Sequence, residues 1–320
     1  MIARRTALAL AFAAFATPVL AQSFPAKPIT IVIGYTPGAV SDLVARTIGE
    51  GLHQAWGQPV IVDNRPGSSG NIGAAFVARA PADGYTLMVG TDATMASNVH
   101  LFKQVGFDPV KDFAPVALAG ANIVCLAVNA DLPVKSVADL IAYAKKNPGK
   151  LSFGSSGVGS PHHLAGELLR QMAGIDIIHV PYKGGGPAMN DVLGGHIPMA
   201  FLSLSAVVPH INTNRVRILA MVEKSRYAAM PDIPTIGETV PGFEMSSWIG
   251  VFAPAGTPPD IVAKLNDGMV KVLTTDAVKA RLATLGLAVI AGKPEDLATV
   301  VKDGIRVRGE LVKAAGIQPE

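Results

Sequence analysis

The residues best suited to chemistry in this chain stand in short loops rich in Gly, Ser and Thr. Small residues let backbone N–H groups approach a ligand closely, and hydroxyls add hydrogen-bond donors. Because the N-terminus of a helix favours negative charge, a small-residue loop that leads into a helix predicts an anion-binding site. Five loops fit this description: GYTPGA (34–39), GSSGN (67–71), GTDAT (90–94), GSSG (154–157) and GGGP (184–187).

Each loop also has a purely structural interpretation. Ser41, Asn71 and Ser160 could be helix N-caps, and Pro161 and Pro187 suit the first helical position. Several loops of one composition in one chain nevertheless favour a shared binding role.

The catalytic motifs that such loops most often carry do not occur in the sequence. There is no G-x-x-x-x-G-K-[ST], and neither GSSGVGSP nor GGGPAM gives G-x-G-x-x-G. GSSGVGSP does not fit the nucleophile elbow G-x-S-x-G either. We therefore expect no catalytic residues and no cofactor, with a hydrolase of another plan as the alternative.

A metal site has weak support in the sequence. His163 and Glu167 are spaced i, i+4 and would share one helix face, next to His162. No H-E-x-x-H is present, and the other histidines are scattered along the chain. We expect a capping or cleft-lining role for these side chains and no metal.

The elements that must position the loops form an α/β pattern. The apolar runs ITIVIGY, PVIVDN and YTLMVG are followed by helical segments that begin at about Ser41, at about Asn71 and near Thr94. This alternation indicates βαβ units with mainly parallel sheets. The loops then lie at the carboxyl ends of the strands, where open α/β sheets bind ligands.

Two extended apolar runs, near residues 119–125 and 245–252, predict two crossings between two lobes. We expect residues 22–121 and 250–320 to form lobe 1 and residues 122–249 to form lobe 2, with the last helices packing on lobe 1. Two crossings make a hinge, and a cleft between such lobes is a common ligand site. Cys125, in the run IVCLAV, is expected in a buried strand.

The N-terminal residues 1–21 predict a secretory signal peptide cleaved after Ala21. They combine a short basic start, an apolar run and a small-residue site. The formal charge of +3 includes Arg4 and Arg5, so the mature chain would carry +3 − 2 = +1, which argues against nucleic-acid binding. We expect a freely diffusing protein of the periplasm.

Successive motifs along nearly all of the mature chain resemble those of the Bug family, the solute receptors of tripartite tricarboxylate transporters, similar to the TctC receptor. The motifs are KPITIVIGYTPGAVSDLVAR, VDNRPGSSGNIGAAFVARAPADGYTLMVG, GSSGVGSPHHLAGELL, VPYKGGGPAMNDVLGGHI, RVRILAMVEKSRYAAMPDIPTIGE and SSWIGVFAPAGTPPDIVAKLN. The set in this order is highly specific.

The resemblance implies a two-lobed, type II periplasmic binding protein of the Venus-flytrap kind, which passes a small carboxylate to membrane permease subunits. It also implies a grip made mostly by backbone amides, with ordered water, so that the N–H of Gly38 and its neighbours would hold the anion. The competing expectation is an electrostatic clamp made by Lys183 and Arg65. A ligand-presenting role toward a sensor kinase is a further alternative to transport.

Carried over residue by residue, the resemblance implies ligand-binding positions in both lobes. They are Tyr35, Thr36, Pro37, Gly38, Ala39, Ser41, Asn71, Thr91, Thr94 and Asn98 in the first lobe, and Ser155, Ser156, Ser160, His163, Tyr182, Gly185 and Ala188 in the second.

Two positions depart from the family pattern. Met95 stands where relatives often have His, and Leu202 stands where an acidic residue often follows Phe. An acidic residue at position 202 would suit an amino group on the ligand. Its absence favours a plain or aromatic carboxylate over an amino acid.

Overall fold

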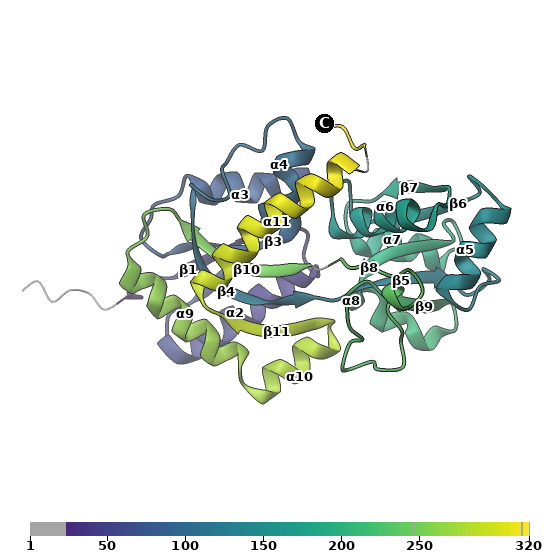
Figure 1. Cartoon of the computed structure of the whole chain (residues 1–320). Helices are drawn as coiled ribbons and strands as arrows, with labels where there is room; N and C mark the ends of the chain where they lie inside the picture. The colour runs from purple at the N-terminus through teal and green to yellow at the C-terminus, as the bar shows by residue number, and fades with distance from the viewer. Residues whose placement is uncertain (1–23, 246, 315, 320) are drawn as a thin grey trace, which may run out of the picture.

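The computed structural model describes residues 24–245, 247–314 and 316–319. These residues form two α/β lobes that stand side by side, with the chain passing between them (Figure 1). The predicted signal peptide, residues 1–21, lies outside the described residues.

The sheet of the first lobe has the strand order β11-β4-β10-β3-β1-β2. β1 pairs in parallel with β2 and β3, whereas β10 returns from the other lobe and runs antiparallel between β3 and β4. The strands are β1 (Ile29–Ile33), β2 (Val60–Asn64), β3 (Thr86–Thr91), β4 (Phe113–Asn122), β10 (Trp248–Pro254) and β11 (Leu287–Gly292).

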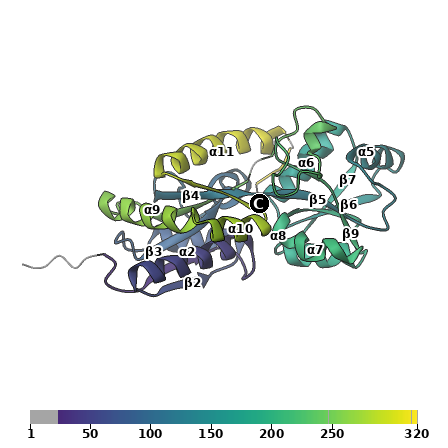
Figure 2. The same ribbon diagram turned by 90° about the horizontal axis from the view of Figure 1, so that it is seen from below.

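Helices cover both faces of this sheet, which is why its strands read as continuous apolar runs. Val44 of α2 (Val40–Trp56), Met269 of α9 (Pro259–Leu273) and Leu282 of α10 (Asp276–Thr284) belong to one core. Val77 of α3 (Asn71–Ala78) and Leu297 of α11 (Pro294–Ala314) belong to the core on the other face. Figure 2 shows α9 and α10 in front of the strands of this lobe and α11 at its top in that view.

The sheet of the second lobe, β7-β6-β8-β5-β9, repeats this plan. Its parallel strands β7, β6 and β8 correspond to β2, β1 and β3, and β5 enters antiparallel beside β8. The strands are β5 (Val124–Asn129), β6 (Leu151–Ser155), β7 (Ile177–Pro181), β8 (Met199–Ser203) and β9 (Val216–Met221), and the helices are α5 (Val137–Lys146), α6 (Pro161–Ala173), α7 (Gly185–Leu193) and α8 (Leu204–Val207).

Short helical segments complete the two lobes. They are η2 (Ser68–Gly70), the π-helical η3 (Ala93–Ser97), α4 (Asn98–Leu101), η4 (Val208–Thr213) and η5 (Ile236–Glu238).

Both predicted crossings are confirmed. Only Ile123 separates β4 in one sheet from β5 in the other, and on the return Ser247 directly precedes β10. The Asn122 N–H donates to the Ser247 carbonyl at 2.9 Å, so the two crossings lie side by side. Cys125 is fully buried in β5, as expected. We retain the boundaries 121/122 and 249/250 as a proposal.

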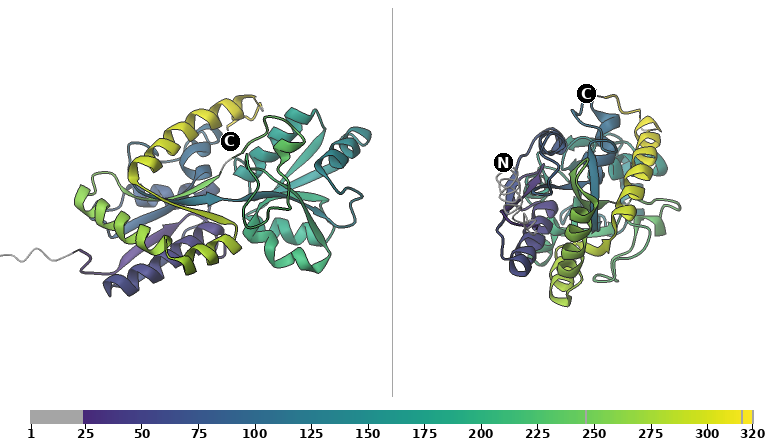
Figure 3. Two further views of the ribbon diagram at one scale, coloured as in Figure 1. Left: turned by 60° about the horizontal axis from the view of Figure 1, so that its bottom comes forward. Right: turned by 90° about the vertical axis from the view of Figure 1, so that its left-hand side faces the viewer.

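The C-terminal helix does more than pack on lobe 1. α11 runs along that lobe toward the second one (Figures 1 and 3), and Val312 near its end is buried in the core that α6 shares with β6. Arg308, one turn earlier, forms a buried ion pair with Asp92 at 3.0 Å. The helix therefore ties the end of β3 to the second lobe.

The end of β1 touches the turn before α3 so closely that only glycine fits. A Cβ on Gly34 would lie 2.4 Å from the Gly70 Cα. We expect Gly34→Ala to lower the free energy of unfolding by about 1–3 kcal/mol, because one backbone segment must move. Gly186→Ala is the control, since its Cβ would meet nothing within 4 Å. Equal unfolding free energies for the two variants in urea titrations would contradict this packing.

Candidate functional site

A cavity of about 290 Å³ lies between the lobes at the hinge, and residues of both lobes line it. Asp92 is the charged side chain in its described lining, and no Lys or Arg is among those residues. The lining consists of Tyr35, Thr36, Pro37, Gly38, Ala39, Val40, Ser41, Thr91, Asp92, Asn122, Ser156, Ser160, Pro161, His162, Gly184, Gly185, Gly186, Pro187, Ser203, Ser205, Ala206 and Ser247.

Helix α2 begins at this cavity without a side-chain cap. Ala39 holds the N-cap position and has no hydroxyl or carboxylate to offer. The first N–H groups of a helix have no partner within the helix, so those of Val40 and Ser41 remain to be satisfied. Both residues line the cavity.

Helix α7 of the second lobe begins at the cavity in the same way. Gly184 is its N-cap, again without a side-chain bond, and Gly185 and Gly186 supply its first N–H groups. Helix α5, which lies away from the cavity, is capped normally: the Ser136 hydroxyl accepts from the Asp139 N–H at 3.1 Å. Both α2 and α7 thus begin at the cavity without a side-chain cap, whereas α3, α9 and α10 lack such a cap and begin elsewhere.

Asp42 fixes the first-lobe loop. Its carboxylate accepts from the Arg46 guanidinium at 2.9 and 3.0 Å, from Asn64 at 3.0 Å and from the Gly38 N–H at 3.0 Å. Burial alone would raise the pKa of Asp42, but these donors outweigh it and hold the pKa below its ordinary value.

The expectation that the Gly38 N–H holds the ligand stays a prediction, and in this structure that N–H has another acceptor. That N–H is already bonded to Asp42. What Gly38 supplies is its backbone shape, because its φ of 85° is unfavourable for any residue with a side chain. The free amides belong to the next residues, Val40 and Ser41.

A second network, also in lobe 1, holds the 67–70 loop. The Ser69 carbonyl accepts from Tyr35 Oη at 3.1 Å, Thr94 Oγ1 at 3.1 Å and Asn98 Nδ2 at 3.0 Å. Asn98 also donates to Asn71 Oδ1 at 2.6 Å. The loop so fixed reaches across the cleft, where the Ser69 hydroxyl donates to the Val158 carbonyl of the other lobe at 3.3 Å.

The hinge side of the cavity is a buried polar chain. Ser247 donates to Asp92 Oδ1 at 2.8 Å and accepts from Asn122 Nδ2 at 3.3 Å. The other Asp92 oxygen meets Arg308, so the charge of Asp92 is compensated within the protein. Arg308 also contacts the sulfur of Met245 on the second crossing.

His162 lies in the cavity wall between two serines. Its Nδ1 is 2.6 Å from Ser156 Oγ and its Nε2 is 3.1 Å from Ser203 Oγ. Burial lowers the pKa of His162 to about 4, so the ring is neutral near pH 7.

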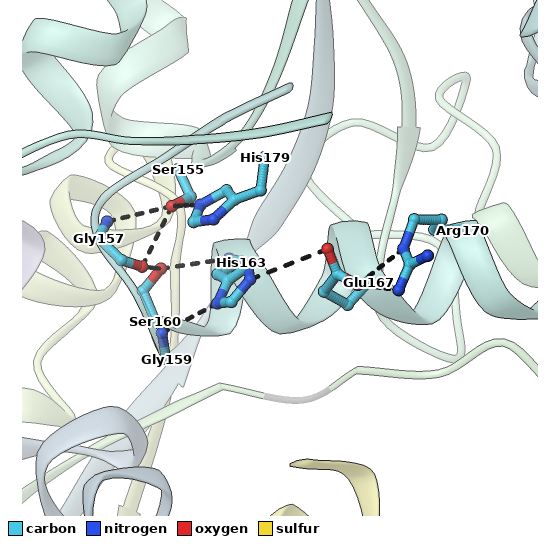
Figure 4. A network of polar contacts seen from close by, with 8 residues as sticks. All are labelled: Ser155, Gly157, Gly159, Ser160, His163, Glu167, Arg170 and His179. Carbon is cyan, nitrogen blue, oxygen red and sulfur yellow. Dashed lines mark hydrogen bonds and ion pairs between the residues drawn. The ribbon is translucent and has the colours of Figure 1, made fainter. Parts of the chain in front are cut away.

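His163, the next residue, does not line the cavity and belongs instead to a separate polar network (Figure 4). Its Nδ1 accepts from the Gly159 N–H at 3.0 Å, and its ring stacks on His179 at 3.8 Å between centroids. Its Nε2 is 3.9 Å from Glu167 Oε1, but burial lowers the pKa of His163 to about 4. This contact is therefore not an ion pair at neutral pH, and Glu167 instead pairs with Arg170 at 2.8 Å.

The structure sorts the predicted ligand-binding residues into two groups. Those that line the cavity are Tyr35, Thr36, Pro37, Gly38, Ala39, Ser41, Thr91, Ser156, Ser160 and Gly185. Those outside the lining are Asn71, Thr94, Asn98, Ser155, His163, Tyr182 and Ala188. Members of the second group support the loops: Ser155 bonds His179 at 2.7 Å and Tyr182 bonds Asp191 at 2.6 Å. A direct ligand contact by any of these residues stays a prediction.

Several lining residues were not predicted as ligand contacts. Val40, Pro161, Gly184, Gly186 and Pro187 adjoin predicted positions and complete the same loops, whereas Asp92, Asn122, His162, Ser203, Ser205, Ala206 and Ser247 come from other elements or faces. The signal for His162 and Pro161 was the motif GSSGVGSPHH itself. For Asn122 and Ser247, the signal was their place in the two crossings.

The cap predictions have a mixed outcome. Ser160 is the N-cap of α6, accepting from the His163 N–H at 3.2 Å, and Pro161 is the first residue of that helix. Ser41 and Asn71 are not N-caps, because Ala39 and Gly70 hold those positions. Pro187 is the third residue of α7 rather than the first.

The two departures from the family pattern lie in the cores. Met95 and Leu202 are fully buried, in lobe 1 and lobe 2 respectively, and neither lines the cavity. Lys183 and Arg65 do not line it either, and Arg65 is bonded to Asp63 at 2.7 Å. No group of His, Cys, Asp and Glu suited to a metal ion occurs among the described residues.

The sequence and the fold both resemble known receptors. Residues 44–317 match the model of the tripartite tricarboxylate transporter family receptor. Protein BugT of Bordetella pertussis is 34% identical over 309 residues, which cover 96% of this chain and 95% of BugT.

Two solved structures share the fold and contain a named ligand. R. palustris Rpa4515 with adipate has a TM-score of 0.89 and 38% identity, covering 93% of this chain and 100% of that one. MatC from Rhodopseudomonas palustris with bound malate has a TM-score of 0.83 and 33% identity, covering 90% and 100%. Both are periplasmic binding protein folds of the expected two-lobed kind.

The buried histidines predict an acid-sensitive second lobe. The pKa of His163 is about 4 in the folded chain against an ordinary value of 6.5, so only the unfolded chain binds this proton between those values. Stability from this group is present above pH 6.5 and is lost as the pH falls toward 4. We expect urea titrations to show that the advantage of wild type over His163→Gln in unfolding free energy shrinks steadily as the pH falls from 6.5 to 4. A difference that stays constant with pH would contradict a neutral buried ring.

Proposed function

The chain belongs to the family of tripartite tricarboxylate transporter receptors, and we propose that it captures one small organic carboxylate in the cavity between its lobes. Receptors of this family are periplasmic and serve transport. We further propose that backbone N–H groups of this chain hold the anion and that the anion is passed on unchanged.

The observation that carries the proposal is the pair of uncapped helix N-termini at one cavity. The free amides of Val40 and Ser41 on α2 and of Gly185 and Gly186 on α7 come from opposite lobes. A carboxylate taken from water needs several hydrogen bonds to its charged oxygens, and helix N-termini supply donors and partial positive charge together. One anion bonded to both helices would also hold the lobes closed.

The cavity suits a carboxylate better than a cationic or apolar ligand. Its donors are backbone amides and hydroxyls, and its single described carboxylate is neutralised by Arg308. The adipate and malate held by the two solved relatives are small dicarboxylates. We infer a ligand of that size and charge.

Transport without chemical change is the role we propose, with handover to the membrane permease subunits of the transporter. No helix in the described part of the chain has the length and apolar character to cross a bilayer. Export through a signal peptide cut after Ala21 belongs to the same proposal. We keep presentation to a sensor kinase and hydrolysis as alternatives, although no described contact favours either.

A thermal-shift screen over organic acids tests the proposal. A ligand at about 100 times its dissociation constant adds roughly 2.7 kcal/mol of stability, so a true ligand raises the melting temperature clearly. Recovery of the acid unchanged after incubation separates binding from hydrolysis. A panel of mono- and dicarboxylates with no effect on melting would contradict carboxylate capture.

Val40→Pro tests the amide grip directly. Val40 is the first residue of α2, where proline is tolerated, and Ala39 before it has ψ 155°, which proline also accepts. The substitution therefore removes one N–H without breaking a helix bond. We expect calorimetry to show a loss of about 1.5–3 kcal/mol in binding free energy, the usual worth of a hydrogen bond to a charged group.

Val40→Ala is the matched control, since it shortens the same side chain and keeps the N–H. It should bind nearly as wild type does. Lys183→Ala should also cost little, because Lys183 lies outside the cavity lining. Normal binding by Val40→Pro with a large loss for Lys183→Ala would move the site to the charged rim.

A further inference from the structure

We propose that His162 is a positioning residue for ligand specificity, which makes Ser203 a hydrogen-bond donor to the ligand and prevents Ser156 from donating. This inference rests on the proposed function, because it names the groups of the second lobe that read the anion. Both serines and His162 line the cavity.

The imidazole bridges the two hydroxyls. Ser156 stands in the loop after β6, and Ser203 is the last residue of β8, so the ring at the start of α6 connects neighbouring strand ends. In the described part of the chain, neither hydroxyl has another hydrogen-bond partner (Ser156 Oγ and Ser203 Oγ each meet only this ring). His162 is only 6% exposed, which leaves the ring little room to turn.

A neutral imidazole forces the two serines into different roles. It has one N–H donor and one lone pair, so it donates to one serine and accepts from the other. Burial, with the pKa of His162 lowered to about 4, keeps the ring in this neutral form near pH 7. The serine that accepts keeps its own O–H for the ligand, whereas the serine that donates presents only lone pairs.

The two distances decide which serine is which. Hydrogen bonds donated by a hydroxyl are typically shorter than those donated by an N–H. The bond between Ser156 and Nδ1 is 2.6 Å, and the bond between Nε2 and Ser203 is 3.1 Å. This difference assigns the proton of the ring to Nε2, with Ser156 donating to Nδ1 and Ser203 accepting.

The two serines therefore present different hydrogen-bonding groups to the ligand. A carboxylate oxygen finds a donor at Ser203 and meets lone pairs at Ser156. Helix α6, whose N-terminus carries the ring, is capped by its own Ser160, which accepts from the His163 N–H. The ligand oxygens are thus expected on the Ser203 side of the ring.

Nitrogen NMR of the ligand-free protein tests the tautomer. The His162 ring signals, identified by their absence from the spectrum of His162→Gln, should show a protonated Nε2 and an unprotonated Nδ1 at pH 7. A proton on Nδ1, or on both nitrogens, would overturn the inference. This measurement needs no ligand, so it stands even if the choice of ligand is wrong.

Calorimetry with malate and adipate tests the consequence. We expect Ser203→Ala to weaken binding roughly tenfold or more, because a hydrogen bond to a charged group is lost. Ser156→Ala should weaken binding by a clearly smaller factor. Equal losses for the two variants would contradict the different roles of Ser203 and Ser156. If the wild-type protein bound neither acid, the proposed function would be contradicted instead.

The same pair of substitutions in a His162→Phe background isolates the positioning role. Without the ring nitrogens both hydroxyls are free to donate, so the difference between the two serine variants should disappear. A difference that persists at full size would show that His162 does not position the serines. If His162→Phe fails to fold, His162→Gln serves, because its amide can turn over and should shrink the difference in the same way.

Discussion

The structure depends on one constraint: two helix N-termini from opposite lobes meet at one cavity, and neither has a capping side chain among the described residues. The N–H groups in the first turn of a helix have no acceptor within the helix, so a capping side chain, water or a ligand must satisfy them. Here α2 and α7 begin with Ala39 and Gly184, which cannot cap. We propose that an anion accepts from both ends and so joins the lobes, with no cation buried beside it.

The rest of the fold keeps those amides in place and prevents the protein from satisfying them itself. Asp42 could fold back onto the start of α2, but Arg46 and Asn64 hold its carboxylate so that it takes the Gly38 amide instead. Asp92 lines the cavity and could compete with the ligand for these N–H groups, but its ion pair with Arg308 neutralises its charge. The two sheets, built on one plan, then bring one such helix from each side to the hinge.

Much of this arrangement could be predicted from the sequence, because it depends on local signals. The alternation of apolar runs and helices predicted the α/β class, and four of the five small-residue loops line the cavity, whereas the loop at residues 67–71 does not. Which side chain of a helix faces the cavity could not be predicted. His162 and His163 are about 100° apart on α6, and only the packing of the core residues Leu164 and Leu169 decides which of them reaches the cavity. The ion pair between Asp92 and Arg308 joins residues 216 positions apart, which no local pattern reveals.

The most direct test of the account is a crystal structure of the protein with the carboxylate selected by thermal shift. The account predicts carboxylate oxygens within about 2.7–3.2 Å of backbone nitrogens at the starts of α2 and α7, directly or through one ordered water. A carboxylate bound instead by the side chains of Lys183 or Arg65, with the amides of Val40, Ser41, Gly185 and Gly186 left unpaired, would contradict it.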